Sequence, residues 1–191
     1  MDQNTFKRTL IHVKRAQGIA RRYFITNGFD GALTLLGLMV GFAGNSNVAL
    51  PIAIKAGLGA AIALFMSGIS SAYLSETAER KNELRDLEGA LLSNLSESDY
   101  GKASRYVPIL VALVNGLSPL LIALIILTPL WLAEAGMQLP VSPFIAAIII
   151  ALFILFLLGI MLGVLSKEFW LWTGLRTLTI AGLTVLIISL F

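Results

Sequence analysis

The chain contains no cysteine in its 191 residues, and this absence removes several classes of chemistry. Disulfides, thiolate-bound metals and a nucleophilic thiol are all excluded, although the absence of cysteine does not identify a compartment. Histidine is nearly absent too, because His12 is the only one, so one chain cannot build a site from several imidazoles. We expect His12 to be a surface side chain rather than a metal ligand.

Charged residues are also scarce. They make up 13% of the chain, whereas hydrophobic residues make up 57%. A soluble globular domain is about 25% charged and about 45–50% apolar. The composition therefore predicts a membrane protein with little sequence left for a separate soluble domain.

Five runs of apolar residues are long enough to cross the hydrocarbon core, which needs about 20 residues per helix. Only helices and closed barrels satisfy the backbone in lipid, and these runs are too long and too continuously apolar for barrel strands. The predicted fold is an all-α membrane protein with five transmembrane helices. Their approximate ranges are residues 25–44, 56–74, 107–132, 143–165 and 172–191.

Basic residues are distributed unevenly among the predicted loops. All of the 14 Lys and Arg residues except Lys55 fall in the N-terminal segment, between spans two and three, or around the start of span five. In a five-span protein these regions share one side, which the positive-inside rule places in the cytoplasm. We therefore expect a cytoplasmic N-terminus and an external C-terminus. The small size and the absence of a targeting extension suit a multi-pass location in a prokaryotic plasma membrane.

Residues 1–24 are predicted to form an N-terminal amphipathic helix at the membrane interface. Apolar side chains from Phe6 to Tyr23 alternate there with basic ones at roughly helical spacing. An ordinary juxtamembrane anchor would show the same pattern. The remainder, 25–191, is the predicted transmembrane domain. It includes a Glu-rich cytoplasmic segment, 75–105, that we expect to continue span two as a helix.

Asp30 is the most informative residue for function. It lies inside the apolar first span, where an ionisable group is costly unless it faces a bundle interior, a partner or a water-filled path. Asn27, one turn earlier, can share a ligand or a proton with it. With Met66 in span two and Asn115 in span three, these residues are the predicted transport path. A gap-filling methionine and a packing kink are the plainer interpretations of Met66 and Asn115.

Four carboxylates recur along the segment that follows span two. Glu76, Glu79, Glu83 and Asp86 are spaced so that a helix would place all of them on one face. Carboxylate oxygens are hard ligands that suit Fe²⁺, Mn²⁺, Mg²⁺ or Ca²⁺, so this face is the predicted metal-binding site. A solvated helix laced by salt bridges, with Arg80 pairing to its neighbours, is the alternative that the mixed charges favour.

Two pairs of glycines are spaced four residues apart inside predicted spans, Gly37 with Gly41 and Gly159 with Gly163. Such pairs allow two helix backbones to approach closely. The pattern is common. It weakly predicts close helix contacts, for which contact between protomers is one interpretation.

Four motifs follow one another along the chain. They are Gly28-Phe29-Asp30-Gly31 in span one, Ala72-Tyr73-Leu74-Ser75-Glu76 at the end of span two, Gly116-x-x-Pro119-Leu120-Leu121 in span three, and GLRTLTIAG at 174–182 in span five. Their order and spacing, over about residues 20–191, resemble the vacuolar iron transporter (VIT) family. The short 75–105 segment is similar to that of prokaryotic-type members.

The resemblance implies a homodimer of five-span protomers that exports cytoplasmic Fe²⁺ or Mn²⁺ in exchange for protons, along a path between the protomers. It implies that Asp30 is the intramembrane carboxylate of that path. It further implies that Glu76, Glu79 and Glu83 begin the metal-binding face. The metal ion and the lipid bilayer are then the expected partners, with no resident cofactor, catalytic residue or nucleic acid.

Two positions depart from the family pattern. Ala72 stands where the family has a glutamate, and Gly68 stands near an expected methionine. These departures favour one alternative, a non-transporting membrane scaffold or regulator with the same fold. A second alternative is a metal-dependent membrane enzyme that acts on lipid phosphates, with Arg80 and Lys81 near the acidic face. Because no nucleophile–base pair is evident, we expect a transporter rather than an enzyme.

Overall fold

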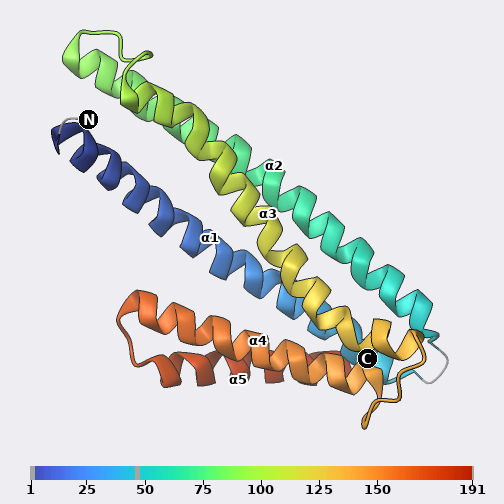
Figure 1. Ribbon diagram of the computed structural model, residues 1–191. Coiled ribbons are helices and arrows are strands. Elements are labelled where there is room, and N and C mark those ends of the chain that lie inside the picture. The colour runs from blue at the N-terminus through green and yellow to red at the C-terminus, as the bar shows by residue number, and fades with distance from the viewer. Residues whose placement is uncertain (1–2, 46–47, 191) are drawn as a thin grey trace. The chain divides into compact units, whose positions relative to one another are not determined.

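The computed structural model describes residues 3–45 and 48–190, with side chains described from Gly18 onward. Within these residues the chain forms five α-helices and no strand (Figure 1). They are α1 (Gln3–Ala43), α2 (Leu50–Leu91), α3 (Asp99–Glu134), α4 (Pro143–Ser166) and α5 (Trp170–Ser189). Each contains a stretch long and apolar enough to cross a membrane. The predicted all-α fold with five candidate spans is therefore confirmed.

α1 is a single helix from Gln3 to Ala43, so the predicted N-terminal helix and the first span are continuous. The side chains that define its predicted amphipathic face, together with His12, lie largely outside the described side chains. Interfacial placement of residues 1–24 and a cytoplasmic N-terminus thus stay predictions.

α2 begins at Leu50, earlier than the predicted start near residue 56. Pro51 lies in the first turn, where proline is tolerated because its missing N–H would have no intrahelical acceptor. Lys55 consequently lies in the helix rather than in a loop. At its other end α2 runs on to Leu91, so the predicted helical continuation of span two is confirmed as far as that residue. The rest of the 75–105 segment is not part of this helix, because residues 92–98 are not helical and α3 begins at Asp99.

α3 remains helical through Pro108, Pro119 and Pro129. Proline inside a helix removes one backbone hydrogen bond and usually bends the axis. Pro108 and Pro119 are fully buried, so protein atoms surround both rings.

The chain divides into two compact units, which are described separately below. The first unit comprises the chain through Phe24 together with Met66–Leu117. The second comprises Ile25–Phe65 and Ser118–Phe191. α1, α2 and α3 each contribute to both units, whereas α4 and α5 belong wholly to the second.

α4 and α5 form an antiparallel hairpin within the second unit (Figure 1). The turn is short because Lys167 adopts a left-handed conformation, with φ of 58°, and the amides of Lys167 and Glu168 both donate to the Gly163 carbonyl. Gly159 and Gly163 face α5, where the Thr177 hydroxyl donates to the Leu155 carbonyl at 3.0 Å. The predicted close contact at Gly159 and Gly163 thus forms within one chain.

Replacing Gly159 with alanine is expected to destabilise this hairpin. The added Cβ would press on the Thr177 hydroxyl and lie 2.9 Å from Gly174 Cα, and overpacking of this kind costs about 1–3 kcal/mol. The matched control is Gly182→Ala in α5, where no described atom lies within 4 Å of the added Cβ and helix propensity improves. Thermal unfolding in detergent compares the two, and an equal midpoint for both variants would contradict the packing.

Candidate functional site

Asp30 is oriented by the two glycines that flank it in α1. Gly28 and Gly31 are buried against α3 in the second unit, while Asp30 is exposed. A Cβ on Gly31 would lie 2.7 Å from Pro119 Cα, and one on Gly28 would lie 2.8 Å from Ile122 Cδ1. This contact leaves no room for side chains on the α3 side of the helix. The carboxyl group of Asp30 therefore points away from the packed side of α1.

The apolar surroundings of Asp30 in the sequence make its exposure significant. It lies within the apolar stretch Gly18–Ala43 of α1. An uncovered acidic side chain at the centre of a membrane-spanning helix costs about 2.5–3.5 kcal/mol on insertion scales. Such a group is normally covered by a partner or lines a water-filled path. The exposed side of α1 around Asp30 thus has the character of a surface that another molecule or water covers.

The other predicted path residues have three different environments. Asn27 is half-buried in the second unit, one turn from Asp30. Met66, in the first unit, is 55% exposed and so fills no gap within the protomer. Asn115, also in the first unit, is buried. Because these residues belong to separate units, a common path through Asn27, Asp30, Met66 and Asn115 stays a prediction.

Asn115 joins α3 to α2. Its side-chain Nδ2 donates to the Gly68 carbonyl at 2.7 Å in a buried position. The helices can approach this closely because residue 68 has no side chain: a Cβ there would lie 3.1 Å from Gly116 Cα. A buried amide that bonds to a neighbouring helix stabilises helix association. Its hydrogen bond to Gly68 agrees with the packing interpretation of Asn115.

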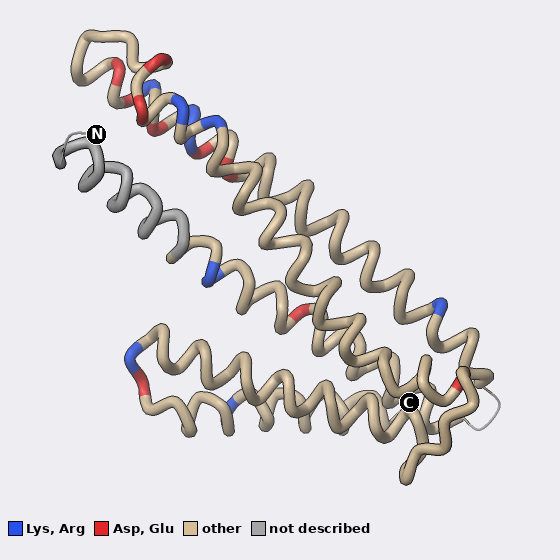
Figure 2. The backbone as a smooth tube through the Cα atoms, viewed as in Figure 1, with Lys and Arg blue, Asp and Glu red and all other residues tan. Residues whose placement is uncertain are grey.

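The four carboxylates of the predicted metal-binding face differ in exposure. All four lie on the C-terminal part of α2. Charged residues gather there and on the N-terminal part of α3 (Figure 2). Glu79 and Asp86 are exposed, Glu83 is half-buried, and Glu76 is only 4% exposed. The common helical face therefore presents two carboxylates to solvent and turns two toward the protein.

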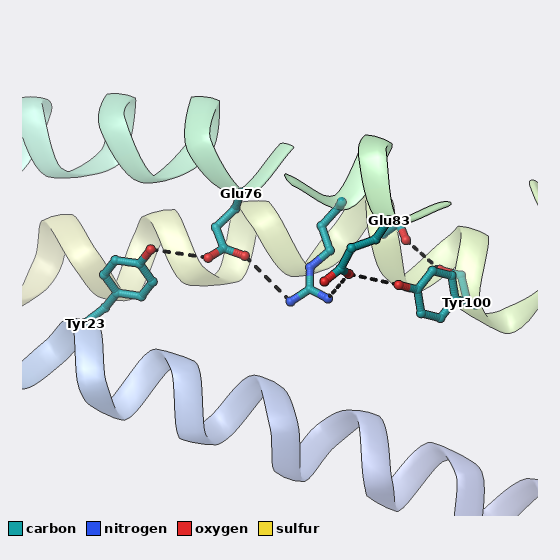
Figure 3. Close-up of polar contacts among 6 residues, drawn as sticks. Tyr23, Glu76, Glu83 and Tyr100 are labelled. Carbon is teal, nitrogen blue, oxygen red and sulfur yellow. Dashed lines mark hydrogen bonds and ion pairs between the residues drawn. The ribbon is translucent and has the colours of Figure 1, made fainter. Parts of the chain in front are cut away.

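Glu76 and Glu83 belong to a chain of polar contacts that crosses all three helices of the first unit (Figure 3). Tyr23 of α1 donates its hydroxyl to Glu76 at 3.3 Å, and Tyr100 of α3 donates to Glu83 at 2.9 Å. Arg80 lies between the two carboxylates. Its Nη2 is 3.7 Å from Glu76 Oε2, and its Nη1 donates to Glu83 Oε2 at 3.1 Å.

Because Arg80 and Glu76 are largely buried, the loss of either one would cost more free energy than at an exposed position. The side chain of Arg80 is 12% exposed and that of Glu76 is 6% exposed. Removing one partner of a buried ion pair costs about 3–5 kcal/mol because it leaves an uncompensated charge. Within the described residues, no three His, Asp or Glu side chains are arranged to hold a metal ion. Metal binding by Glu76, Glu79, Glu83 and Asp86 stays a prediction, with Arg80 already paired to two of them.

Sequence reasoning identified the carboxylates and the pairing of Arg80 but missed both tyrosines. Helical spacing is enough to bring Arg80 to Glu76 and Glu83, because neighbours three and four residues apart share a face. The sequence pattern instead groups Tyr23 with the apolar side chains of an interfacial helix. Tyr100 meets Glu83 only because the chain reverses between α2 and α3. No local pattern in the sequence predicts either contact.

Comparison with known proteins gives one informative relative. No family model matches the chain, and no solved structure matches it significantly. The chain is similar to the uncharacterized protein MJ0645 of Methanocaldococcus jannaschii, with 31% identity over 158 residues. The match covers 81% of this chain and 79% of the relative. This chain therefore belongs to the same family as the archaeal protein MJ0645.

Proposed function

We propose that the protein exports divalent metal ions, Fe²⁺ or Mn²⁺, from the cytoplasm in exchange for protons, as a homodimer similar to vacuolar iron transporters. The observation that carries this proposal is the exposed carboxyl group of Asp30 on a helix long and apolar enough to span the membrane. A structural carboxylate would be turned into the protomer and paired. A carboxylate that serves a path has to remain accessible.

A second copy of the chain is the covering partner that the geometry favours. Two α1 helices, each with Asp30 on its exposed side, would shield the carboxyl groups from lipid and enclose a polar route between them. Gly28 and Gly31 support this arrangement, because their packing against α3 fixes the direction in which Asp30 points. Carboxylate oxygens are suitable ligands for Fe²⁺ and Mn²⁺.

The charged end of the first unit would serve as the cytoplasmic entrance. The distribution of Lys and Arg supports this side assignment and an external C-terminus. Glu79 and Asp86 are exposed and can attract cations from solution, and Glu76 and Glu83 lie on the same helix. Local negative charge raises the concentration of cations near an entrance.

Competition at one carboxylate provides the coupling. Asp30 can hold a metal ion when it is deprotonated, or a proton, but not both. A proton that arrives from outside then displaces the metal toward that side, and loss of the proton to the cytoplasm restores the site. One residue could thereby couple the two opposed fluxes.

One observation favours a second function, a membrane scaffold or regulator that does not transport. Gly68 packs directly on the α3 backbone, which leaves no room for a methionine there, and Ala72, which stands in place of the glutamate of the transporter pattern, is buried. If these two ligands are indispensable, the fold remains without the activity. Flux measurement separates the two functions.

Asp30→Asn is expected to abolish metal flux without unfolding the protein, because the amide keeps the shape of the side chain and loses the charge. Flux of Mn²⁺, and of Fe²⁺ under anaerobic conditions, is measured in proteoliposomes with and without a pH gradient. Glu97→Gln, the same change at an exposed loop position, is the control and should behave as wild type. Wild-type flux in Asp30→Asn would remove Asp30 from the mechanism, and absence of flux in folded wild type would favour the scaffold.

Thr26→Cys is expected to form a disulfide between protomers, because Thr26 is exposed one turn before Asp30 on α1. The natural chain has no cysteine, so any cross-link reports the introduced thiol. Membranes are oxidised and the dimer band is measured on non-reducing gels. Thr179→Cys makes the same exchange at an exposed position of α5 and should remain monomeric. Cross-linking through α5 alone would place the interface elsewhere.

A further inference from the structure

The attraction of metal ions does not explain why a protein cation, Arg80, lies at the centre of the chain of polar contacts. Arg80 lies on the same helix as the four carboxylates and pairs with two of them. A face that served only to attract metal ions would gain from leaving Glu76 and Glu83 free. Arg80 instead occupies both carboxylates with a positive charge that belongs to the protein.

The planar guanidinium suits this bridging position. Its two terminal nitrogens each reach one carboxylate, Glu76 on one side and Glu83 on the other. Tyr23 and Tyr100 bind the same two carboxylates from α1 and α3 (Figure 3). Arg80 therefore holds in place the groups through which the neighbouring helices are attached to α2. We call these five residues the latch: Tyr23, Glu76, Arg80, Glu83 and Tyr100.

Some buried polar groups in and beside the closed latch lack hydrogen bonds. Among the described residues, these are the Nε of Arg80 and the hydroxyl of Thr77, which is next to Glu76 in the sequence. Buried polar groups without partners destabilise the arrangement that contains them. The ion pairs that close the latch are thus opposed by this local cost, which reduces the free energy needed to open it.

We propose that Arg80 is a tethered cation that keeps the latch closed, and that an arriving divalent cation opens it by displacing the guanidinium from Glu76 and Glu83. The identity of the arriving ion rests on the proposed function, whereas closure of the latch by Arg80 does not. The exchange balances in charge: two carboxylates with Arg80 carry a net charge of minus one, and with a divalent ion in its place they are neutral. Arg80 leaves still protonated and enters solvent.

A single cysteine can report whether the latch is open. The natural chain has none, and Thr77, next to Glu76 in α2, has a buried hydroxyl of nearly the size of a thiol. Thr77→Cys in purified protein in lipid nanodiscs is exposed to a maleimide, and its rate of labelling is measured. The same reporter is combined with Arg80→Gln and, as a matched control, with Arg85→Gln, an exposed arginine of the same helix.

The Arg80→Gln background is expected to label at least about tenfold faster than the reporter alone, because the buried carboxylates lose their common partner. The Arg85→Gln background should label at the rate of the reporter alone. Mn²⁺ should accelerate labelling when Arg80 is present and have no further effect in Arg80→Gln. A folded Arg80→Gln protein that labels no faster, or a reporter unaffected by Mn²⁺, overturns the proposal.

Arg80→Lys provides the test if Arg80→Gln fails to fold. Lysine keeps the charge as a single ammonium that cannot fork between two carboxylates, so labelling should fall between the rates of the other two backgrounds. A rate equal to that with arginine would overturn the bridging role. Mn²⁺ flux of the natural chain is measured separately: flux without any effect of Arg80 on labelling rejects the latch alone, and a working latch without flux rejects the transport function alone.

Discussion

Direct contact between helix backbones is the interaction on which the rest of this structure depends. Lipid chains are as apolar as leucine, so the hydrophobic effect that drives soluble helices together is weak inside a membrane, and close packing has to replace it. In the second unit Gly31 meets the backbone of Pro119, and Gly159 meets Gly174. In the first unit Gly68 meets Gly116. These contacts determine which polar side chains of the helices face outward.

Close packing explains why the Asp30 side chain is exposed and why the Asn115 side chain is buried with a bond to α2. Helix sides made of glycine exclude water and leave no room for a ligand, so polar groups there either bond across the contact, as Asn115 does to Gly68, or point away. Asp30 points away. The same contacts that stabilise the helices thus separate a polar group with a structural role from one that is available to another molecule.

The all-α fold with five candidate spans could be predicted because the length and composition of an apolar stretch are enough to identify a candidate membrane helix. Five apolar stretches, the helical run beyond span two and the close approach at Gly159 follow from local spacing. The start of α2 was predicted too late, since apolarity marks membrane depth whereas a helix ends where its backbone bonds end. The latch could not be found beforehand, because Tyr23 and Tyr100 reach Glu76 and Glu83 only once three helices are assembled.

The three-residue turn between α4 and α5 also bears on how the chain enters the membrane. The contacts of the α4–α5 hairpin join residues that are close in sequence, such as Gly163 with Glu168 and Leu155 with Thr177. Contacts of this kind form early because little chain entropy is lost in closing them. The hairpin contains its own packing surface and its own turn, so its two helices can pair with each other as they form. The last two helices then need no template from the preceding part of the chain to find each other.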